Sequence, residues 1–176
     1  AAPAKGDDYV RFDHVLQRDR VETDGRMERT YEGRVLLRNA AAVTAFGQIS
    51  MPYVDGFGEV TFEGVTIGKP DGRVVEVQGQ VEDINPFGLT GTSIAADVRF
   101  RKLTIPGLEP GDTLSYRIVR RERPLAPGKI FGEAKLSPLV ADPLQIYELD
   151  LPRNAPIHVR LRSGLGAEWQ ELDAPA

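Results

Sequence analysis

The chain has 176 residues, of which 41% are hydrophobic, so its length fits one large domain or two small ones with a buried core. Lysine and arginine number 22 against 26 aspartates and glutamates, and the net charge of −4 argues against general nucleic-acid binding, which needs a basic footprint. The absence of cysteine excludes a disulfide framework, a cysteine zinc site and a thiol nucleophile from this sequence. No apolar run approaches the roughly 20 residues that a membrane-spanning helix needs.

The first residues, AAPAKGDD at 1–8, are interpreted as a disordered or processed N-terminal segment. Ala-Ala-Pro-Ala followed by charged residues is what cleavage of a signal peptide would leave, although an artificial boundary explains it equally well. A cysteine-free composition is also compatible with the bacterial periplasm, where stray thiols are oxidised. Both features are compatible with an exported protein.

Turn signals rich in glycine and proline divide the remaining chain into short extended segments. They lie at residues 22–27, 53–59, 69–73, 84–91, 105–112, 125–129 and 151–156. The clearest is the sequence Lys-Pro-Asp-Gly between two valine-rich runs, where Pro70 suits the first corner of a turn and Gly72 accepts a positive φ. Residues 65–77 are therefore predicted to form a β-hairpin, in which Asp71 serves the turn rather than a reaction.

No amphipathic helix of ten or more residues is predicted. The strongest candidate is residues 39–49, whose alanines favour a helix, whereas Val43 and Phe46 suit a strand equally well and Gly47 weakens a helix. We leave the structure of this segment open between the two.

Alternation of apolar and polar side chains marks the later segments as strands with one solvent-exposed face. In residues 113–120, Leu114 and Tyr116 share one face, and the same period of two occurs in residues 145–152 and 157–163. We count roughly ten strands at the spacing of an all-β, antiparallel β-sandwich. We predict one such domain at residues 9–163. Residues 164–176 are interpreted as a strand start or a linker to a further domain.

The polar residues show no catalytic, cofactor-binding or metal-binding pattern. His14, on the same face as Phe12 in a strand, is interpreted as a core or rim histidine, and His158 as an exposed one, because metal sites need three or four convergent ligands. No Gly-x-Ser-x-Gly motif is present. The carboxylates of Asp55, Glu59 and Asp83 are candidate calcium ligands, but their spacing matches no calcium-binding loop.

Two sets of residues remain as candidates for binding. In the first set, the arginines of the basic run are interpreted as solvated side chains that pair with acidic neighbours, or as a contact with an anionic surface or a neighbouring domain: Arg117, Arg120, Arg121 and Arg123. Trp169, near the C-terminus, is interpreted as a side chain that packs against a following domain. The second set lies in or beside turns and is interpreted as plugs at the sandwich ends, or as a ligand-stacking patch: Tyr53, Phe57 and Phe87. A hydrolase that uses two separated carboxylates also stays open, because sequence alone cannot pair such residues.

The order of the segments carries a family resemblance. DRVETDGRMERTYEGRVLL at 19–37 is followed by the hairpin at 65–77, by DVRFRKLTIPGLEPGDTLSYRI at 97–118 and by FGEAKLSPLVADPLQIYELDLPRNAPIHV at 131–159. In this order and spacing, residues 9–163 resemble a bacterial domain of unknown function that precedes transglutaminase-like domains of the papain superfamily in exported proteins.

The resemblance implies an immunoglobulin-like β-sandwich in the periplasm or outside the cell, N-terminal to a domain with a Cys-His-Asp catalytic set. It implies no catalytic residue in this chain, so any catalytic domain would lie after Ala176. We therefore predict a non-catalytic accessory domain that docks against, or presents substrate to, that transglutaminase-like partner. The alternative is a freestanding carbohydrate- or protein-binding module of the cell envelope. No cofactor is expected.

Overall fold

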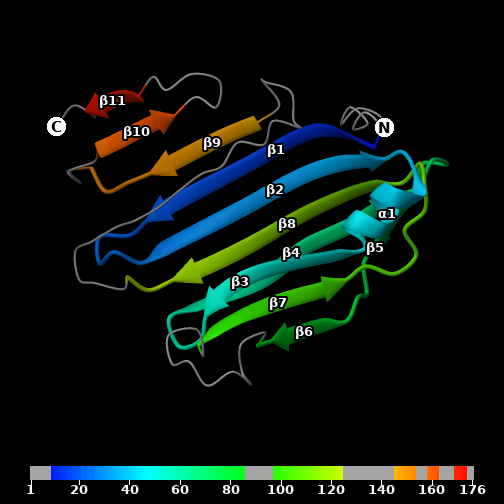
Figure 1. The fold of residues 1–176 in the computed structure, drawn as a ribbon, viewed down its shortest axis with the longest axis horizontal. Coiled ribbons are helices and arrows are strands. Elements are labelled where there is room, and N and C mark those ends of the chain that lie inside the picture. The colour runs from blue at the N-terminus through cyan, green and yellow to red at the C-terminus, as the bar shows by residue number, and fades with distance from the viewer. Residues whose placement is uncertain (1–8, 86–96, 125–144, 154–157, 163–168, 174–176) are drawn as a thin grey trace, which may run out of the picture.

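The computed structural model describes residues 9–85, 97–124, 145–153, 158–162 and 169–173, the last two ranges as backbone only. Within these residues the chain forms one short helix and a series of strands (Figure 1). The elements are β1 Val10–Val21, β2 Met27–Leu37, α1 Ala40–Phe46, β3 Gln48–Val54, β4 Gly58–Gly68, β5 Val74–Glu76, β6 Val81–Ile84, β7 Val98–Thr104, β8 Thr113–Glu122, β9 Gln145–Asp150, β10 His158–Arg162 and β11 Trp169–Asp173.

The strands form a large sheet and a small sheet that pack face to face. The large sheet has the order β5-β4-β8-β2-β1-β9, the small one has the order β3-β7-β6, and β10 pairs with β11 separately. Neighbouring strands are antiparallel except β1 and β9, which are parallel. The predicted all-β, antiparallel β-sandwich of roughly ten strands is therefore confirmed. No helix in the described residues is long and apolar enough to span a membrane.

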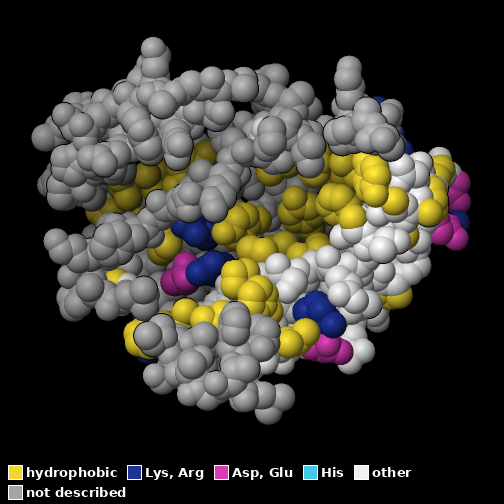
Figure 2. Space-filling view, in the orientation of Figure 1, with side chains coloured by type: hydrophobic (Ala, Val, Ile, Leu, Met, Phe, Trp, Pro, Cys, Tyr) yellow, Lys and Arg dark blue, Asp and Glu magenta, His cyan; other side chains and the backbone are white. Residues whose placement is uncertain are grey.

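The hydrophobic core lies between the two sheets and under α1. Val35, Leu37 and Leu114 of the large sheet are fully buried, and Leu103 of the small sheet packs in the same cluster. Each such side chain contributes about 1.5–3 kcal/mol by leaving water. Leu114 belongs to the apolar face that the alternation in β8 predicted. Figure 2 shows hydrophobic side chains gathered over this part of the molecule.

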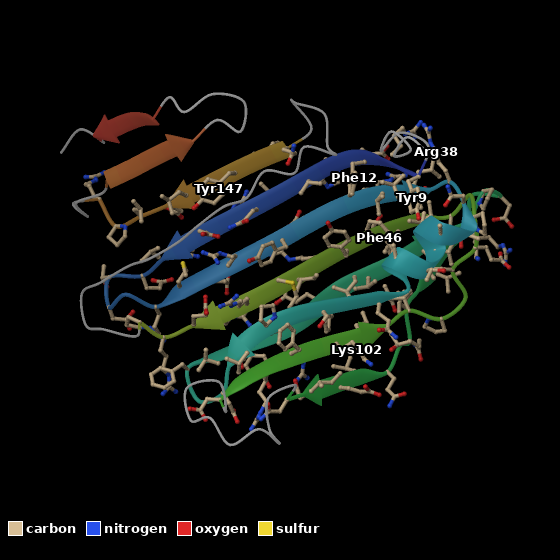
Figure 3. The ribbon with its side chains drawn as sticks, viewed as in Figure 1. Tyr9, Phe12, Arg38, Phe46, Lys102 and Tyr147 are labelled. Carbon is tan, nitrogen blue, oxygen red and sulfur yellow. The ribbon has the colours of Figure 1, made fainter. Side chains whose placement is uncertain are left out.

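The helix α1 covers one end of the core. The ring of its last residue, Phe46, meets the ring of Phe12 on β1 edge to face, with centroids 6.2 Å apart (Figure 3). The segment that the sequence left open between helix and strand is in fact both. The Asn39 side chain caps the helix by accepting a hydrogen bond from the Ala42 amide (2.9 Å), and β3 begins directly after Gly47.

The predicted hairpin at residues 65–77 is present as β4 and β5. Gly72 has a φ of +89°, and Asp71 accepts a hydrogen bond from the Arg73 amide (3.0 Å), so the aspartate shapes the turn as expected. Lys69 reaches from this turn to Asp112 at the start of β8, with 2.9 Å between the ammonium and the buried carboxylate. This ion pair ties the hairpin to the β7–β8 corner.

A β-bulge in β1 corrects the prediction for His14. Phe12 pairs with Val35 and His14 pairs with Arg34, the next residue on β2, because the bulge adds one residue to β1. His14 therefore lies on the opposite face from Phe12, where it is exposed rather than part of the core. The prediction that the two side chains share a face is wrong for this reason.

Candidate functional site

One end of the large sheet carries a cleft of about 670 Å³, which we call the end cleft. Three pieces of chain meet there: the β1–β2 turn, the β3–β4 turn and the last residues of β8. The cleft is lined by Glu22, Arg26, Met27, Glu28, Gly56, Phe57, Gly58, Glu59, Arg121, Glu122 and Arg123. Three of the predicted binding residues, Phe57, Arg121 and Arg123, are thus brought together.

Tight turns place the walls of the end cleft. Gly25 in the β1–β2 turn and Gly56 in the β3–β4 turn have φ values of +86° and +76°, which glycine adopts without steric cost. The Arg123 amide donates a hydrogen bond to the Phe57 carbonyl (2.7 Å), which extends the pairing of β4 with β8 by one residue. Both residues also line the end cleft, so this hydrogen bond places Phe57 and Arg123 next to each other at its wall.

The Phe57 ring and the Arg123 guanidinium are the open groups of the end cleft. Phe57 is 47% exposed, although a large aromatic side chain is more often covered. Arg123 is exposed and forms no ion pair with any residue that the structure describes. An apolar ring and an unpaired cation therefore face solvent next to each other.

Arg121 organises the acidic wall of the end cleft. Its guanidinium contacts the carboxylates of Glu28 (2.8 Å), Glu63 (3.4 Å) and Glu59 (3.7 Å). The hydrogen bond that Arg121 donates to Glu28 raises the pKa of Arg121, and the charges of Glu28 and Glu63 act in the same direction. Exposed ion pairs of this kind contribute at most about 1 kcal/mol each to stability. Their main consequence is that Arg121 already has carboxylate partners and is not available to a ligand.

The arginines of β8 are divided between the two faces of the sheet. Arg117 lies on the same face as Arg121 and pairs with Glu32 and Glu63. Arg120 points to the opposite face, where it pairs with Glu122, while its Nε atom is buried without a hydrogen-bond partner among the described residues. The basic run at 117–123 is therefore not one continuous patch, because successive strand residues alternate in direction.

The remaining predicted binding residues lie elsewhere. Tyr53 is half-buried on β3, and its hydroxyl donates a hydrogen bond to Asp83 (3.1 Å). Partial burial raises the pKa of Tyr53, and the hydrogen bond to Asp83 adds to this effect. Phe87 lies outside the described residues, and Trp169 lies in β11, of which only the backbone is described.

Sequence reasoning missed a buried ion pair near the end cleft. Asp19 on β1 is 1% exposed and accepts two hydrogen bonds of 2.7 Å from Arg29 on β2. Gln17 (3.1 Å) and the Tyr147 hydroxyl (3.2 Å) also donate to this carboxylate. Burial opposes the charge of Arg29, but the hydrogen bonds and charge of Asp19 outweigh it, so the pKa of Arg29 lies above its ordinary value.

The carboxylates of the end cleft are engaged with arginines rather than placed as an acid and a base. Glu28 and Glu59 pair with Arg121, and Glu122 pairs with Arg120. Within the described part of the chain, no three histidine, aspartate or glutamate side chains converge on a possible metal position. The residues considered for calcium instead form separate ion pairs: Asp55–Arg99, Asp83–Arg101 and Glu59–Arg121.

A known structure shares this fold at low sequence identity, and another superposes more loosely. A "putative protease" from Parabacteroides distasonis superposes with a TM-score of 0.67 and 13% identity over 95% of this chain and 36% of that chain. This chain therefore spans about a third of that protein. The CBM3a-L domain of the cipA scaffoldin from Clostridium thermocellum gives a TM-score of 0.38 at 12% identity, covering 77% of this chain and 82% of that one. No protein with a curated description matches the sequence.

A family assignment comes from the sequence itself. The pattern of DUF3857, a domain of unknown function with a solved structure, matches residues 23–170. The match includes the strands β2 to β10 and most of the residues that line the end cleft. The resemblance to a domain of unknown function is thereby confirmed, while its place before a transglutaminase-like domain stays a prediction. This protein belongs to the DUF3857 family.

Proposed function

We propose that this chain is a non-catalytic accessory domain of an exported bacterial protein, and that it docks against, or presents substrate to, a following transglutaminase-like domain. The observation that carries the proposal is that the fold of nearly the whole chain recurs as about a third of a longer protein, the Parabacteroides "putative protease". A fold that forms one part of a longer chain fits an accessory role.

The end cleft supports binding rather than chemistry. Its carboxylates are held by arginines, while Phe57 and Arg123 stay open to solvent. Aromatic and arginine side chains are enriched where proteins bind one another, because each offers a large contact area and directional contacts. The catalytic cysteine of this proposal belongs to the partner domain, since this sequence contains none.

Export to the periplasm or the exterior is part of the same proposal. A chain without cysteine folds without risk of stray thiol oxidation in an oxidising compartment. Fractionation of the native cells, with an antibody to this domain, tests the location. Recovery of the protein in the cytoplasmic fraction alone would overturn this part of the proposal.

The native reading frame beyond Ala176 gives the decisive test of the accessory role. We expect it to continue into a segment with a cysteine, a later histidine and an aspartate. In that longer protein, hydrogen exchange at the described backbone amides should be slower at the domain contact than in this chain alone. A frame that ends at Ala176, or one that continues into an unrelated domain, contradicts the proposal.

A second candidate function is a freestanding carbohydrate- or protein-binding module of the envelope. The exposed ring of Phe57 favours it, because aromatic faces stack on sugars and on apolar side chains alike. Affinity electrophoresis in gels that contain envelope polysaccharide would show retardation of the parent and not of the Phe57→Ala variant. Equal mobility of the two proteins in every gel excludes polysaccharide binding through this ring.

A further inference from the structure

We infer that the end cleft binds an acidic peptide segment whose carboxylate contacts Arg123 and whose neighbouring apolar side chain covers Phe57. The inference deepens the proposed accessory role, on which it rests for the source of the peptide, namely the following domain. The argument has three parts, which concern the charges of the end cleft, the side on which the carboxylate lies, and the apolar surface.

Ion pairing leaves a single binding position for an anion among the described side chains of the end cleft. The other charged side chains of the lining already have partners: Arg26 with Asp24, Glu22 with Arg20, Glu28 and Glu59 with Arg121, and Glu122 with Arg120. Arg123 has no such partner within the described residues. An incoming carboxylate can therefore bind Arg123 without breaking an existing pair, which makes the contact favourable.

The acidic wall determines which side of the end cleft receives the carboxylate. Arg121 is surrounded by Glu28, Glu59 and Glu63, so the surface beside it carries more negative than positive charge. A carboxylate placed there would be repelled, whereas one placed over Arg123 is attracted. The Glu59 side chain is 67% exposed and lies 3.7 Å from the Arg121 guanidinium, so its carboxylate also faces solvent. A neutral or basic side chain of the peptide therefore fits next to it.

The apolar part of the end cleft is contiguous with Arg123. The 2.7 Å backbone hydrogen bond holds Phe57 opposite Arg123, and Phe57 is 47% exposed, so its ring is open to a ligand. A peptide provides a carboxylate and an apolar group one residue apart, whereas a neutral sugar makes no use of the arginine charge.

Nuclear magnetic resonance of the ¹⁵N-labelled chain provides the test. The probe is the blocked peptide Ac-Leu-Glu-Leu-NH₂, and its neutral counterpart is Ac-Leu-Gln-Leu-NH₂. The glutamate peptide should shift the amide signals of residues 57–59 and the Nε–H signal of Arg123 with a dissociation constant of about 1 mM. The glutamine peptide should bind about tenfold more weakly, because it loses the charge-assisted hydrogen bonds.

Two variants separate the proposed contact from a general charge effect. Arg123→Gln should lower the affinity for the glutamate peptide about tenfold and abolish the preference over the glutamine peptide. Arg73→Gln is the matched control, because Arg73 is also exposed but lies in the β4–β5 turn, paired with Asp71. Its affinity for the peptide should be unchanged. Circular dichroism spectra confirm that both variants keep the strand signal of the parent.

Several outcomes would overturn the inference: no shift at about 10 mM peptide, equal binding of the two peptides, or equal loss in both variants. Tighter binding of an acidic sugar, tested with trigalacturonate at the same signals, would assign the end cleft to carbohydrate instead. The accessory role is judged separately from the reading frame beyond Ala176. If the peptide binds but no transglutaminase-like domain follows, the proposed function is rejected and the peptide site is kept. If such a domain follows but the peptide does not bind, only the peptide site is rejected.

Discussion

Replacing Asp19 with asparagine should destabilise the protein more than any change of a surface charge. The carboxylate is 1% exposed and accepts hydrogen bonds from three side chains, those of Arg29, Gln17 and Tyr147. An amide of the same shape keeps the packing but removes the negative charge. Its NH₂ group also faces donors instead of offering them an acceptor.

The magnitude follows from the burial of the partner. The Arg29 side chain is only 9% exposed, so the substitution leaves a buried guanidinium without a counter-charge. Removing one member of a buried ion pair costs about 3–5 kcal/mol, against a total stability of about 5–15 kcal/mol for a domain. For a chain of this size we expect the melting temperature to fall by about 10 °C.

Urea unfolding followed by far-ultraviolet circular dichroism measures the loss in the Asp19→Asn variant. The matched control is Asp150→Asn, because Asp150 is 69% exposed and lies 4.0 Å from Arg20. The control should change the free energy of unfolding by less than about 1 kcal/mol. If Asp19→Asn costs no more than the control, the carboxylate does not stabilise the fold in the way that its contacts indicate.

Two further predictions concern the same face of the large sheet. Partial burial raises the pKa of Tyr147 to about 12, and the negative charge of Asp19 and the hydrogen bond to it act in the same direction. The stability that the protonated Tyr147 hydroxyl contributes is therefore complete below pH 10 and disappears as the pH rises towards 12. Absorbance at 295 nm should show a phenolate that forms only at high pH and is absent from Tyr147→Phe. In Asp19→Asn this phenolate should form at lower pH. Gly33→Ala places a Cβ 2.3 Å from the Tyr116 hydroxyl and should cost about 1–3 kcal/mol in urea unfolding. Gly64→Ala meets its nearest atom at 3.9 Å, and an equal loss there would show that the aromatic contact is not the cause.

Local patterns were sufficient to predict the fold class. The alternation around Leu114 and Tyr116 identified the face of β8 that enters the core, because strand side chains repeat every two residues. The turn chemistry at Asp71 and Gly72 predicted the β4–β5 hairpin for a similar reason, since it depends on neighbours in sequence. Residues 39–49 stayed ambiguous because an N-cap, a short helix and a strand share them.

Contacts between distant segments were not predictable in the same way. The pairing of Asp19 with Arg29 becomes visible only when the β1–β2 hairpin is aligned around the turn that contains Gly25. The available signal for this ion pair was Asp19 itself, a charged residue at a strand position whose side chain is buried. The neighbourhood of Phe57 and Arg123 depends on the register of β4 with β8, and nothing local to either residue indicates it.

That register depends on a β-bulge in the middle of β4. Phe62 pairs with Ile118 and Gly64 pairs with Arg117, so Glu63 is the extra residue between them. If Glu63 instead paired regularly with Ile118, every earlier residue of β4 would shift by one position along β8. Phe57 would then lie opposite Pro124 rather than Arg123. The Glu63 carboxylate contacts Arg117 and Arg121, so the residue that creates the bulge also belongs to the acidic wall of the end cleft. Backbone register and surface charge thus come from the same residue, and the binding chemistry of the end cleft follows from both.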